Sequence, residues 1–359
     1  MKSIYLIIIG IIIIFILYSP QINFFKEYNL EKFKYLENDK DNLENFKYSE
    51  NRFFPFRYFT DENNKVLPIV AVTGFFRDKD KENLFFEYKN KGIKLFGITA
   101  YKSFPTRLLM DNSEGVYEKN DTFDFIDNIK YWLCCFKNKD FFGFTNKNII
   151  IDISESDFYN SEDEHLKRDK KYDFIYICGK DSDDCPLDGW NAFNRNFDLA
   201  LKCFPILFNE YNLKGLVVGR IGCGLEETYG DNIEVVDFLD WYILQEKMRE
   251  SKFLFVPNIY DASPRVVTEC ITKDVPVLMN SNILCGFKYI NYETGEFFSN
   301  EINLRESLNN LLSKKDKISP KKWWNQNYSQ LKSEKRLRNF LYEAFPDVLE
   351  NVERVKFIL

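Results

Sequence analysis

Histidine is almost absent from this chain: its 359 residues contain one, His165. That residue lies in a charged stretch, and we interpret it as a solvated side chain. Neither a Ser-His-Asp triad nor a histidine-based zinc site can therefore be assembled. The eight cysteines add no zinc-like spacing. We expect chemistry that depends on positioning and electrostatics instead.

An excess of positive charge is also missing. The formal net charge is −6, which argues against a nucleic-acid-binding surface as the main role. Hydrophobic residues make up 45% of the chain and aromatic residues 17%, a composition typical of a globular protein. The length is sufficient for two domains of ordinary size.

One long hydrophobic run is present, at the N-terminus. Residues 4–17 are almost wholly apolar and follow Lys2, a length short for a membrane span and long for a signal-peptide core. No small-residue cleavage site follows, so we predict an uncleaved signal anchor over residues 1–20 of a type II membrane protein. Its bulk would face the lumen of the Golgi or endoplasmic reticulum, or lie at a virus-associated membrane. A cleaved signal peptide is the alternative. Residues 21–60 would form a stem.

Beyond the stem the pattern changes to alternating strands and helices. We predict a first Rossmann-like domain over residues 61–165 and a second over residues 170–312, with closing C-terminal helices over residues 313–359. Buried free thiols are the default interpretation of the cysteines, and Cys178 and Cys185, which bracket a loop, could pair in an oxidising lumen. The expected strands are residues 66–76, 93–101, 149–154, 174–178, 215–220, 235–239, 253–257 and 275–279, and the expected helices are residues 82–90, 124–137, 191–211, 240–250, 265–273 and 302–312.

The most informative stretch is residues 251–298. An apolar run over residues 253–257 is typical of a strand buried on both faces. A polar turn follows, and Pro264 stands where a helix begins and loses nothing by lacking an N–H. A second buried strand comes after this short helix. The strand–turn–helix–strand order indicates a βαβ unit, whose turn lies where open α/β sheets bind ligands.

The side chains of that turn and helix suit a nucleotide sugar. Asp261 and Glu269 have seven residues between them. A helix N-terminus and Arg265 lie between the two carboxylates, and both favour a pyrophosphate. Glu269 can accept hydrogen bonds from ribose hydroxyls, and Asp261 from a sugar ring. A helix N-cap with an exposed helical glutamate would give the same spacing.

This segment resembles the donor-binding motif of retaining family-four glycosyltransferases, which have the GT-B fold. Asp261 stands where that family usually has a glutamate. Residues 274–277 (DVPV) are similar to the family's G-x-P-V strand entry, and residues 294–298 (TGEFF) resemble its TGLL turn. Residues 263–267 (SPRVV) also resemble the exostosin-like glycosyltransferases, which share the fold and invert.

The resemblance implies two Rossmann-like domains that face a cleft. It also implies transfer, with retention, of a sugar from a nucleotide sugar to a glycan, protein or lipid acceptor, without an obligate metal or another cofactor. Many members place a histidine near the donor sugar, and this chain lacks it. Asp261 and Glu269 would be the catalytic pair. The implied donor-binding residues are Lys180, Arg195, Ser263, Pro264, Arg265, Glu269, Thr294 and Gly295, and the acceptor-side candidates are Gly74, Lys102 and residues 154–157.

Three alternatives remain at this level. Asp181, Ser182 and Asp183 have the D-x-D form of a metal-binding GT-A glycosyltransferase. The exostosin-like pattern favours inversion instead of retention. Finally, an aspartate at position 261 in place of glutamate shortens the side chain by about one bond length. A catalytic group misplaced by ~1 Å can lower the reaction rate greatly. A GT-B domain that binds a nucleotide without catalysis is therefore the third alternative.

Overall fold

The computed structural model describes residues 54–99, 104–106, 122–160, 168–261 and 263–357. The predicted signal anchor, most of the predicted stem, His165 and Lys102 lie outside these residues. Within the described ranges, no helix combines the length and the apolar character that a membrane crossing requires. The anchor therefore stays a prediction.

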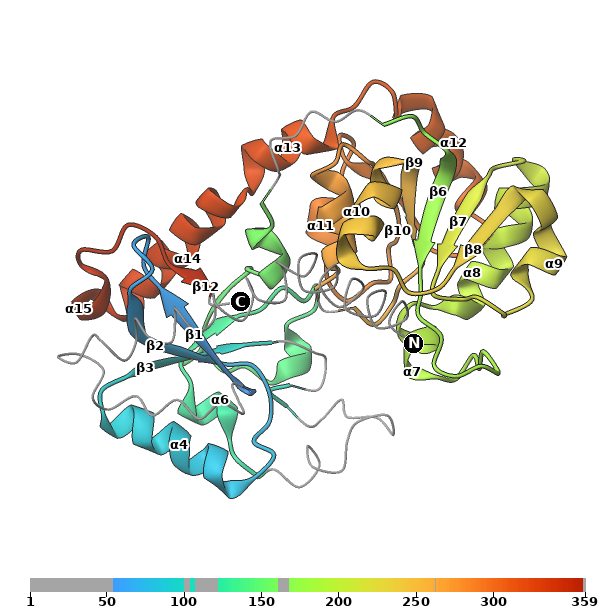
Figure 1. The fold of residues 1–359 in the computed structure, drawn as a ribbon. Coiled ribbons are helices and arrows are strands. Elements are labelled where there is room, and N and C mark those ends of the chain that lie inside the picture. Colours follow the sequence, from blue (N-terminus) through green and yellow to red (C-terminus); the bar gives the residue numbers. More distant parts are fainter. Residues whose placement is uncertain (1–53, 100–103, 107–121, 161–167, 262, 358–359) are drawn as a thin grey trace, which may run out of the picture. The chain divides into compact units, whose positions relative to one another are not determined.

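The first sheet has six strands in the order β12-β1-β2-β3-β4-β5 (Figure 1). Strands β2 to β5 are parallel, whereas β1 pairs antiparallel with both β2 and β12. The last strand comes from the C-terminal end of the described chain, so the chain returns to this sheet after building the second one. The strands are β1 (Phe56–Thr60), β2 (Val66–Val72), β3 (Lys94–Ile98), β4 (Tyr131–Leu133), β5 (Ile149–Ile151) and β12 (Lys356–Phe357).

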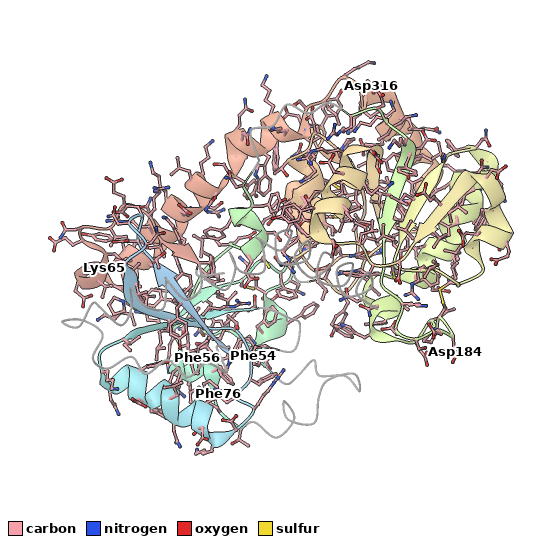
Figure 2. The ribbon with its side chains drawn as sticks, viewed as in Figure 1. Phe54, Phe56, Lys65, Phe76, Asp184 and Asp316 are labelled. Carbon is pink, nitrogen blue, oxygen red and sulfur yellow. A yellow bond between two sulfur atoms is a disulfide. The ribbon has the colours of Figure 1, made fainter. Side chains whose placement is uncertain are left out.

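Alternating side chains of the first sheet pack against helices on both faces. On one face, Leu67 and Ile69 of β2 join a buried cluster with Leu337 of helix α14 (Gln330–Ala344). Helix α4 (Lys79–Asn90) covers the other face through Phe85 and Tyr88. Figure 2 labels Phe56 and Phe76 in this layer, where phenylalanine rings meet in tilted and edge-to-face contacts. Burial of such side chains stabilises the fold by about 1.5–3 kcal/mol each.

The second sheet is wholly parallel, in the order β11-β10-β9-β6-β7-β8. The chain builds β6, β7 and β8 outward in one direction, and then β9, β10 and β11 outward in the other. Strands β6 and β9 are therefore neighbours at the point where the strand order reverses, which is where such sheets bind ligands. The strands are β6 (Tyr172–Ile177), β7 (Gly215–Val218), β8 (Ile233–Val236), β9 (Ser251–Val256), β10 (Val277–Asn280) and β11 (Gly295–Phe298).

Helices bury both faces of the second sheet. Phe253 and Phe255 of β9 belong to one core cluster, whereas Leu254 and Val256 belong to the other. This explains the continuous apolar run in the sequence. The remaining helices are α6 (Phe125–Asn128), α7 (Trp190–Asn194), α8 (Phe197–Phe204), α9 (Leu225–Tyr229), α10 (Trp241–Arg249), α11 (Arg265–Ile271), α12 (Leu304–Lys314), α13 (Pro320–Asn327) and α15 (Pro346–Leu349), with short helical turns η2 (Asp140–Phe142), η3 (Glu155–Phe158), η4 (Pro205–Glu210), η5 (Gly230–Asn232) and η6 (Phe287–Tyr289).

Two predicted helices are wrong in detail. Residues 124–137 form the single turn α6 and then strand β4, because the run around Trp132 is buried throughout and pairs with β3 and β5. The long helix over residues 191–211 is interrupted at Asn196, whose backbone is left-handed (φ 51°). It ends in a π-helical turn that begins at Pro205, a residue without an N–H to continue the α-helical ladder.

The predicted stem also extends too far. Residues 56–60, which we assigned to it, form β1 and carry the buried Phe56 and Phe59. Charged and aromatic residues alternate through this part of the sequence, so no local pattern marks a strand. The ring of Phe56 packs against Phe76 and Tyr88. The ring of Phe59 packs against Phe96 and against Phe357 of β12, which pairs with β1.

The disulfide joins Cys185 to Cys223 and not to Cys178. Cys178, which directly follows β6, is instead a buried free thiol. Its sulfur accepts hydrogen bonds from Nε and Nη2 of Arg220 at 3.3 and 3.0 Å. The bond links the loop after β6 to the loop after β7. Sequence spacing did not reveal this pairing, because the two loops meet only through the parallel pairing of β6 with β7.

Candidate functional site

The candidate site lies at the carboxyl ends of β6 and β9, the two strands at the reversal of strand order. The chain that follows β9 is held at this edge through the carbonyl group of its first residue, Pro257. The amides of Asn196 and Asn280 both donate to the Pro257 carbonyl oxygen, at 3.1 and 2.9 Å. The N–H of Ile259 donates to the Asn194 carbonyl at 3.2 Å. These contacts hold the turn that carries Asp261 in one place.

Asp261 is paired with Arg195. Nη1 of Arg195 donates to Oδ2 of Asp261, and Nδ2 of Asn258 donates to the same oxygen at 3.2 Å. The other carboxylate oxygen, Oδ1, accepts from the backbone N–H of Ser263 at 3.1 Å. The structure thus brings together two predicted site residues, Arg195 and Asp261, and gives both oxygens of the carboxylate a protein partner.

Arg195 stands directly after the short helix α7. The carboxylate of Asp181 accepts from the backbone N–H groups of Asn191 and Ala192, at 2.8 and 3.1 Å, and so caps the start of that helix. A Cβ at Gly189 would lie 2.3 Å from the Asp181 carboxylate, so only glycine fits there. The carboxylate that we considered for a metal-binding D-x-D triplet is therefore used to hold α7.

Lys180 follows β6 at the same edge. Its Nζ pairs with Asp183 at 2.7 Å, and the pKa of Asp183 is lowered chiefly by that hydrogen bond. Asp183 is almost fully exposed, so this pair is weak and exchanges with solvent. Lys180 is thus available to an incoming anion.

Glu269 lies in the second turn of α11 and is largely buried. Its Oε1 accepts a hydrogen bond from the indole N–H of Trp241 at 3.3 Å. Among the described residues, no side chain is recorded as a donor to Oε2. No motif in the sequence marks Trp241, although its position at the start of α10, the helix after β8, places it at the carboxyl edge. That position was the signal that could have found it.

Ser263 and Arg265 differ in what surrounds them. The Ser263 hydroxyl lies 2.7 Å from the Ser156 hydroxyl and 3.0 Å from the Ser154 hydroxyl, so it joins the turn after β9 to the turn η3. Arg265 begins α11 and is exposed. Pro264 packs against Gly286, where a Cβ would come within 2.4 Å of its ring.

No family model and no curated protein matches the sequence. Solved structures do. TarM of S. aureus, in complex with fondaparinux, α-GlcNAc-glycerol and UDP, matches at TM-score 0.51 and 12% identity, over 72% of this chain and 53% of TarM. A sucrose-phosphate synthase from Thermosynechococcus elongatus matches at 0.53 and 11%, over 78% and 74%. A glycosyltransferase from Rickettsia africae matches at 0.52 and 14%, over 79% and 77%.

These neighbours are GT-B glycosyltransferases, and identities this low show the fold alone. The described chain has the GT-B fold. It matches only about half the length of TarM. The family-four and exostosin-like assignments of the sequence analysis are finer than this likeness, so they stay proposals.

Two predicted donor-binding residues lie elsewhere in the GT-B fold. Thr294 and Gly295 stand at the amino-terminal end of β11, whereas Asp261 follows the carboxyl end of β9. The Thr294 hydroxyl donates to the Tyr289 carbonyl at 2.6 Å and is buried. A Cβ at Gly295 would lie 2.0 Å from the Val277 carbonyl oxygen. Both residues thus set the pairing of β11 with β10, and the structure does not bring them to the carboxyl edge.

The acceptor-side candidates are structural in part. Gly74 follows β2, where a Cβ would lie 2.3 Å from the Phe54 ring. Residues 154–157, predicted as a strand end, lie beyond β5 and begin the helical turn η3. The buried Asp157 accepts there from the Tyr289 hydroxyl at 2.5 Å and from Lys288 Nζ at 2.9 Å. Burial opposes the charge on Lys288, but Asp157 and Asp152 outweigh it and raise the pKa of that ammonium group. These contacts join the turn after β5 to the turn before β11.

Proposed function

We propose that this protein is a glycosyltransferase, which moves a sugar from a nucleotide sugar to a glycan, protein or lipid acceptor. The observation that carries the proposal is the set of side chains at the reversal point of the second sheet. A fixed guanidinium, that of Arg195, and the half-occupied carboxylate of Glu269 lie at the edge where a doubly wound sheet binds nucleotides. The GT-B fold supports this reading.

In this proposal Glu269 accepts hydrogen bonds from ribose hydroxyls through Oε2. Arg195, Lys180 and the exposed Arg265 neutralise the diphosphate as it leaves. Fixed cations of this kind stabilise charge that develops in the transition state. Removal of one such preorganised group typically raises the activation free energy by ~2.7–4 kcal/mol. The proposed reaction uses no obligate metal.

Retention at the anomeric carbon is a finer part of the proposal. It rests on the spacing of Asp261 and Glu269, which is similar to that of the retaining family. NMR of the product decides it: an anomeric configuration equal to that of the donor supports retention, and the opposite configuration supports the exostosin-like alternative.

We also propose that the protein acts in an oxidising lumen as a type II membrane protein anchored by residues 1–20. The disulfide between Cys185 and Cys223 supports an oxidising compartment, because such bonds are rare in cytosolic proteins. Protease protection of the full chain in sealed microsomes, lost on adding detergent, is the expected result. Degradation without detergent would contradict it.

Catalysis itself is tested by product release. The full chain is incubated with UDP-, GDP- and ADP-sugars, and released nucleoside diphosphate is measured. We expect slow release from one donor and at least a tenfold loss in Glu269→Ala, because a hydrogen bond to a charged group contributes about 1.5–3 kcal/mol. Glu226→Ala, an exposed position on α9, is the matched control and should behave as wild type.

A second candidate is favoured by one observation. Both oxygens of Asp261 already have protein partners, which suits a GT-B protein that binds a nucleotide without transferring a sugar. Tight nucleotide binding without release from any donor, with candidate glycan acceptors present, would favour this candidate.

A further inference from the structure

We propose that Asp261 is a positioning residue that holds Arg195 against the diphosphate, and that it does not contact the donor sugar. This inference rests on the proposed function, because it assigns roles within the same donor site. It replaces the role that motif resemblance gave to Asp261 with one drawn from its contacts.

The contacts leave the carboxylate little capacity for a sugar. Its Oδ1 is occupied by the Ser263 N–H, and its Oδ2 is shared by Arg195 and Asn258. The side chain of Asp261 is 12% exposed, whereas that of Arg195 is 31% exposed. Of the two partners, the guanidinium is therefore the one that reaches solvent.

The guanidinium keeps donors free for a ligand. An arginine has five N–H donors, arranged to suit two oxygens of a carboxylate or phosphate at once. In the part of the chain that the structure describes, only Nη1 has a side-chain acceptor, namely Asp261. The hydrogens on Nε and Nη2 remain for a second anion. The hydrogen bond from Nη1 to Asp261 fixes the plane of the guanidinium group, and therefore the direction in which Nε and Nη2 donate.

The backbone of Arg195 is held as firmly as its side chain. Its carbonyl oxygen accepts from the buried Tyr176 hydroxyl at 3.2 Å. On the N-terminal side of Arg195, the Asp181 carboxylate caps helix α7. On its C-terminal side, the side-chain amide of Asn196 donates to the Pro257 carbonyl. An arginine fixed at both ends loses little conformational entropy when a phosphate binds, which favours binding.

The short side chain at position 261 also has a physical explanation. Arginine is longer than lysine, so an aspartate meets it across a gap that a glutamate would overfill. Conversely, a lysine at position 195 needs a partner that reaches about 1.5 Å further, which is one C–C bond. A paired exchange, Arg195→Lys with Asp261→Glu, should therefore rebuild the ion pair in a different form.

Calorimetric titration of the full chain with UDP, GDP and ADP, and with the matching monophosphates, tests the inference. For the diphosphate that binds wild type, Arg195→Lys should weaken affinity about tenfold, because the shorter side chain no longer reaches Asp261 and its ammonium lacks the second donor of the guanidinium fork. Asp261→Asn should weaken it about fivefold, because the guanidinium loses its charged anchor. Both variants should lower the preference for diphosphate over monophosphate. The paired exchange should bind the diphosphate at least about threefold more tightly than Arg195→Lys alone, because the longer carboxylate holds the ammonium again although lysine lacks the guanidinium fork; such a gain shows direct coupling of the two residues.

The outcomes separate cleanly. Asp261→Asn keeps an acceptor for the Ser263 N–H, so its ligand-free melting temperature reports whether the turn still folds. Wild-type diphosphate affinity in Asp261→Asn, or a paired exchange no better than Arg195→Lys alone, overturns the inference and leaves the proposed function standing. Absence of diphosphate binding by wild type overturns both.

Discussion

At the scale of single residues, the carboxylates of Asp261 and Glu269 differ in how many of their hydrogen-bond acceptor sites the protein itself occupies. The oxygens of Asp261 are bonded to Arg195, Asn258 and Ser263, although the motif resemblance implies a contact with the sugar. Glu269 keeps the capacity that its predicted role requires, since within the described ranges only its Oε1 accepts a hydrogen bond, from Trp241. A sequence shows which residue types are present, whereas their free lone pairs depend on neighbours brought in by the fold.

Trp241 should affect nucleotide selectivity through Glu269. Trp241→Phe removes the indole donor but keeps an aromatic ring, so the carboxylate is no longer fixed towards the ribose. We expect the preference for a ribonucleotide over its 2′-deoxy form to fall by about two- to tenfold, less than direct loss of the carboxylate would cause, because Trp241 acts only by orienting Glu269. Calorimetry measures it. Tyr242→Phe, at the exposed neighbouring position, is the control, and an unchanged preference in Trp241→Phe would refute the role.

Lys288 should matter to stability. Lys288→Met leaves the buried Asp157 without its cation, which costs about 3–5 kcal/mol of unfolding free energy. Lys252→Met breaks the more exposed pair with Asp173 and should cost no more than about 1 kcal/mol. Because the pKa of Lys288 is raised in the folded state, its contribution is complete below the unfolded value of 10.5 and is lost only as pH rises through the folded pKa. Urea unfolding at neutral pH measures both variants, and equal losses would contradict the account.

At the scale of elements, the acidic loop after β6 supports the candidate site. Figure 2 labels Asp184 in this loop, next to the cysteine that forms the disulfide. The loop holds α7 through Asp181, and α7 presents Arg195. A metal site is an alternative for this loop at the level of sequence, because its carboxylates are visible there. The partners of Asp181, two backbone N–H groups at the start of α7, are visible only in the structure.

Loss of the disulfide should weaken the site as well as the fold. The bond joins Cys185 and Cys223 across 38 residues, and its removal should cost roughly 2–4 kcal/mol. We expect Cys185→Ser with Cys223→Ser to lower the melting temperature and the diphosphate affinity together. A reducing agent should reproduce both effects in wild type and have none on the double variant. A full effect of reductant on the double variant would place the redox sensitivity elsewhere.

At the scale of the whole molecule, periodicity predicted the second sheet better than the first. The buried strands near residues 253–257 and 275–279 are apolar on both faces, so their sequences alone indicate a parallel sheet. The first sheet depends on chain segments far apart in sequence. Its strand β1 and its covering helix α14 are separated by most of the described chain, and no local pattern predicts that they meet.

The candidate site, like the fold, could be predicted only in part from the sequence. The βαβ unit and the pair Asp261 and Glu269 follow from local spacing, and the carboxyl edge follows from the strand order. Local spacing does not predict the disulfide partner Cys223 or the indole donor Trp241. Each follows a different strand of the second sheet and meets its partner only in the folded chain. Thr294 and Gly295 matched a motif whose position at the amino end of β11 only the topology reveals.

The central claim is that this edge of the second sheet binds a nucleoside diphosphate. It is tested most directly by thermal-shift titration of the full chain with UDP, GDP and ADP, in parallel with Glu269→Ala. The account predicts a concentration-dependent rise in melting temperature with one of the three, because a ligand that binds only the folded state stabilises it. That rise should be largely lost in Glu269→Ala. No rise with any of them at millimolar concentration, or an equal rise in the variant, would contradict it.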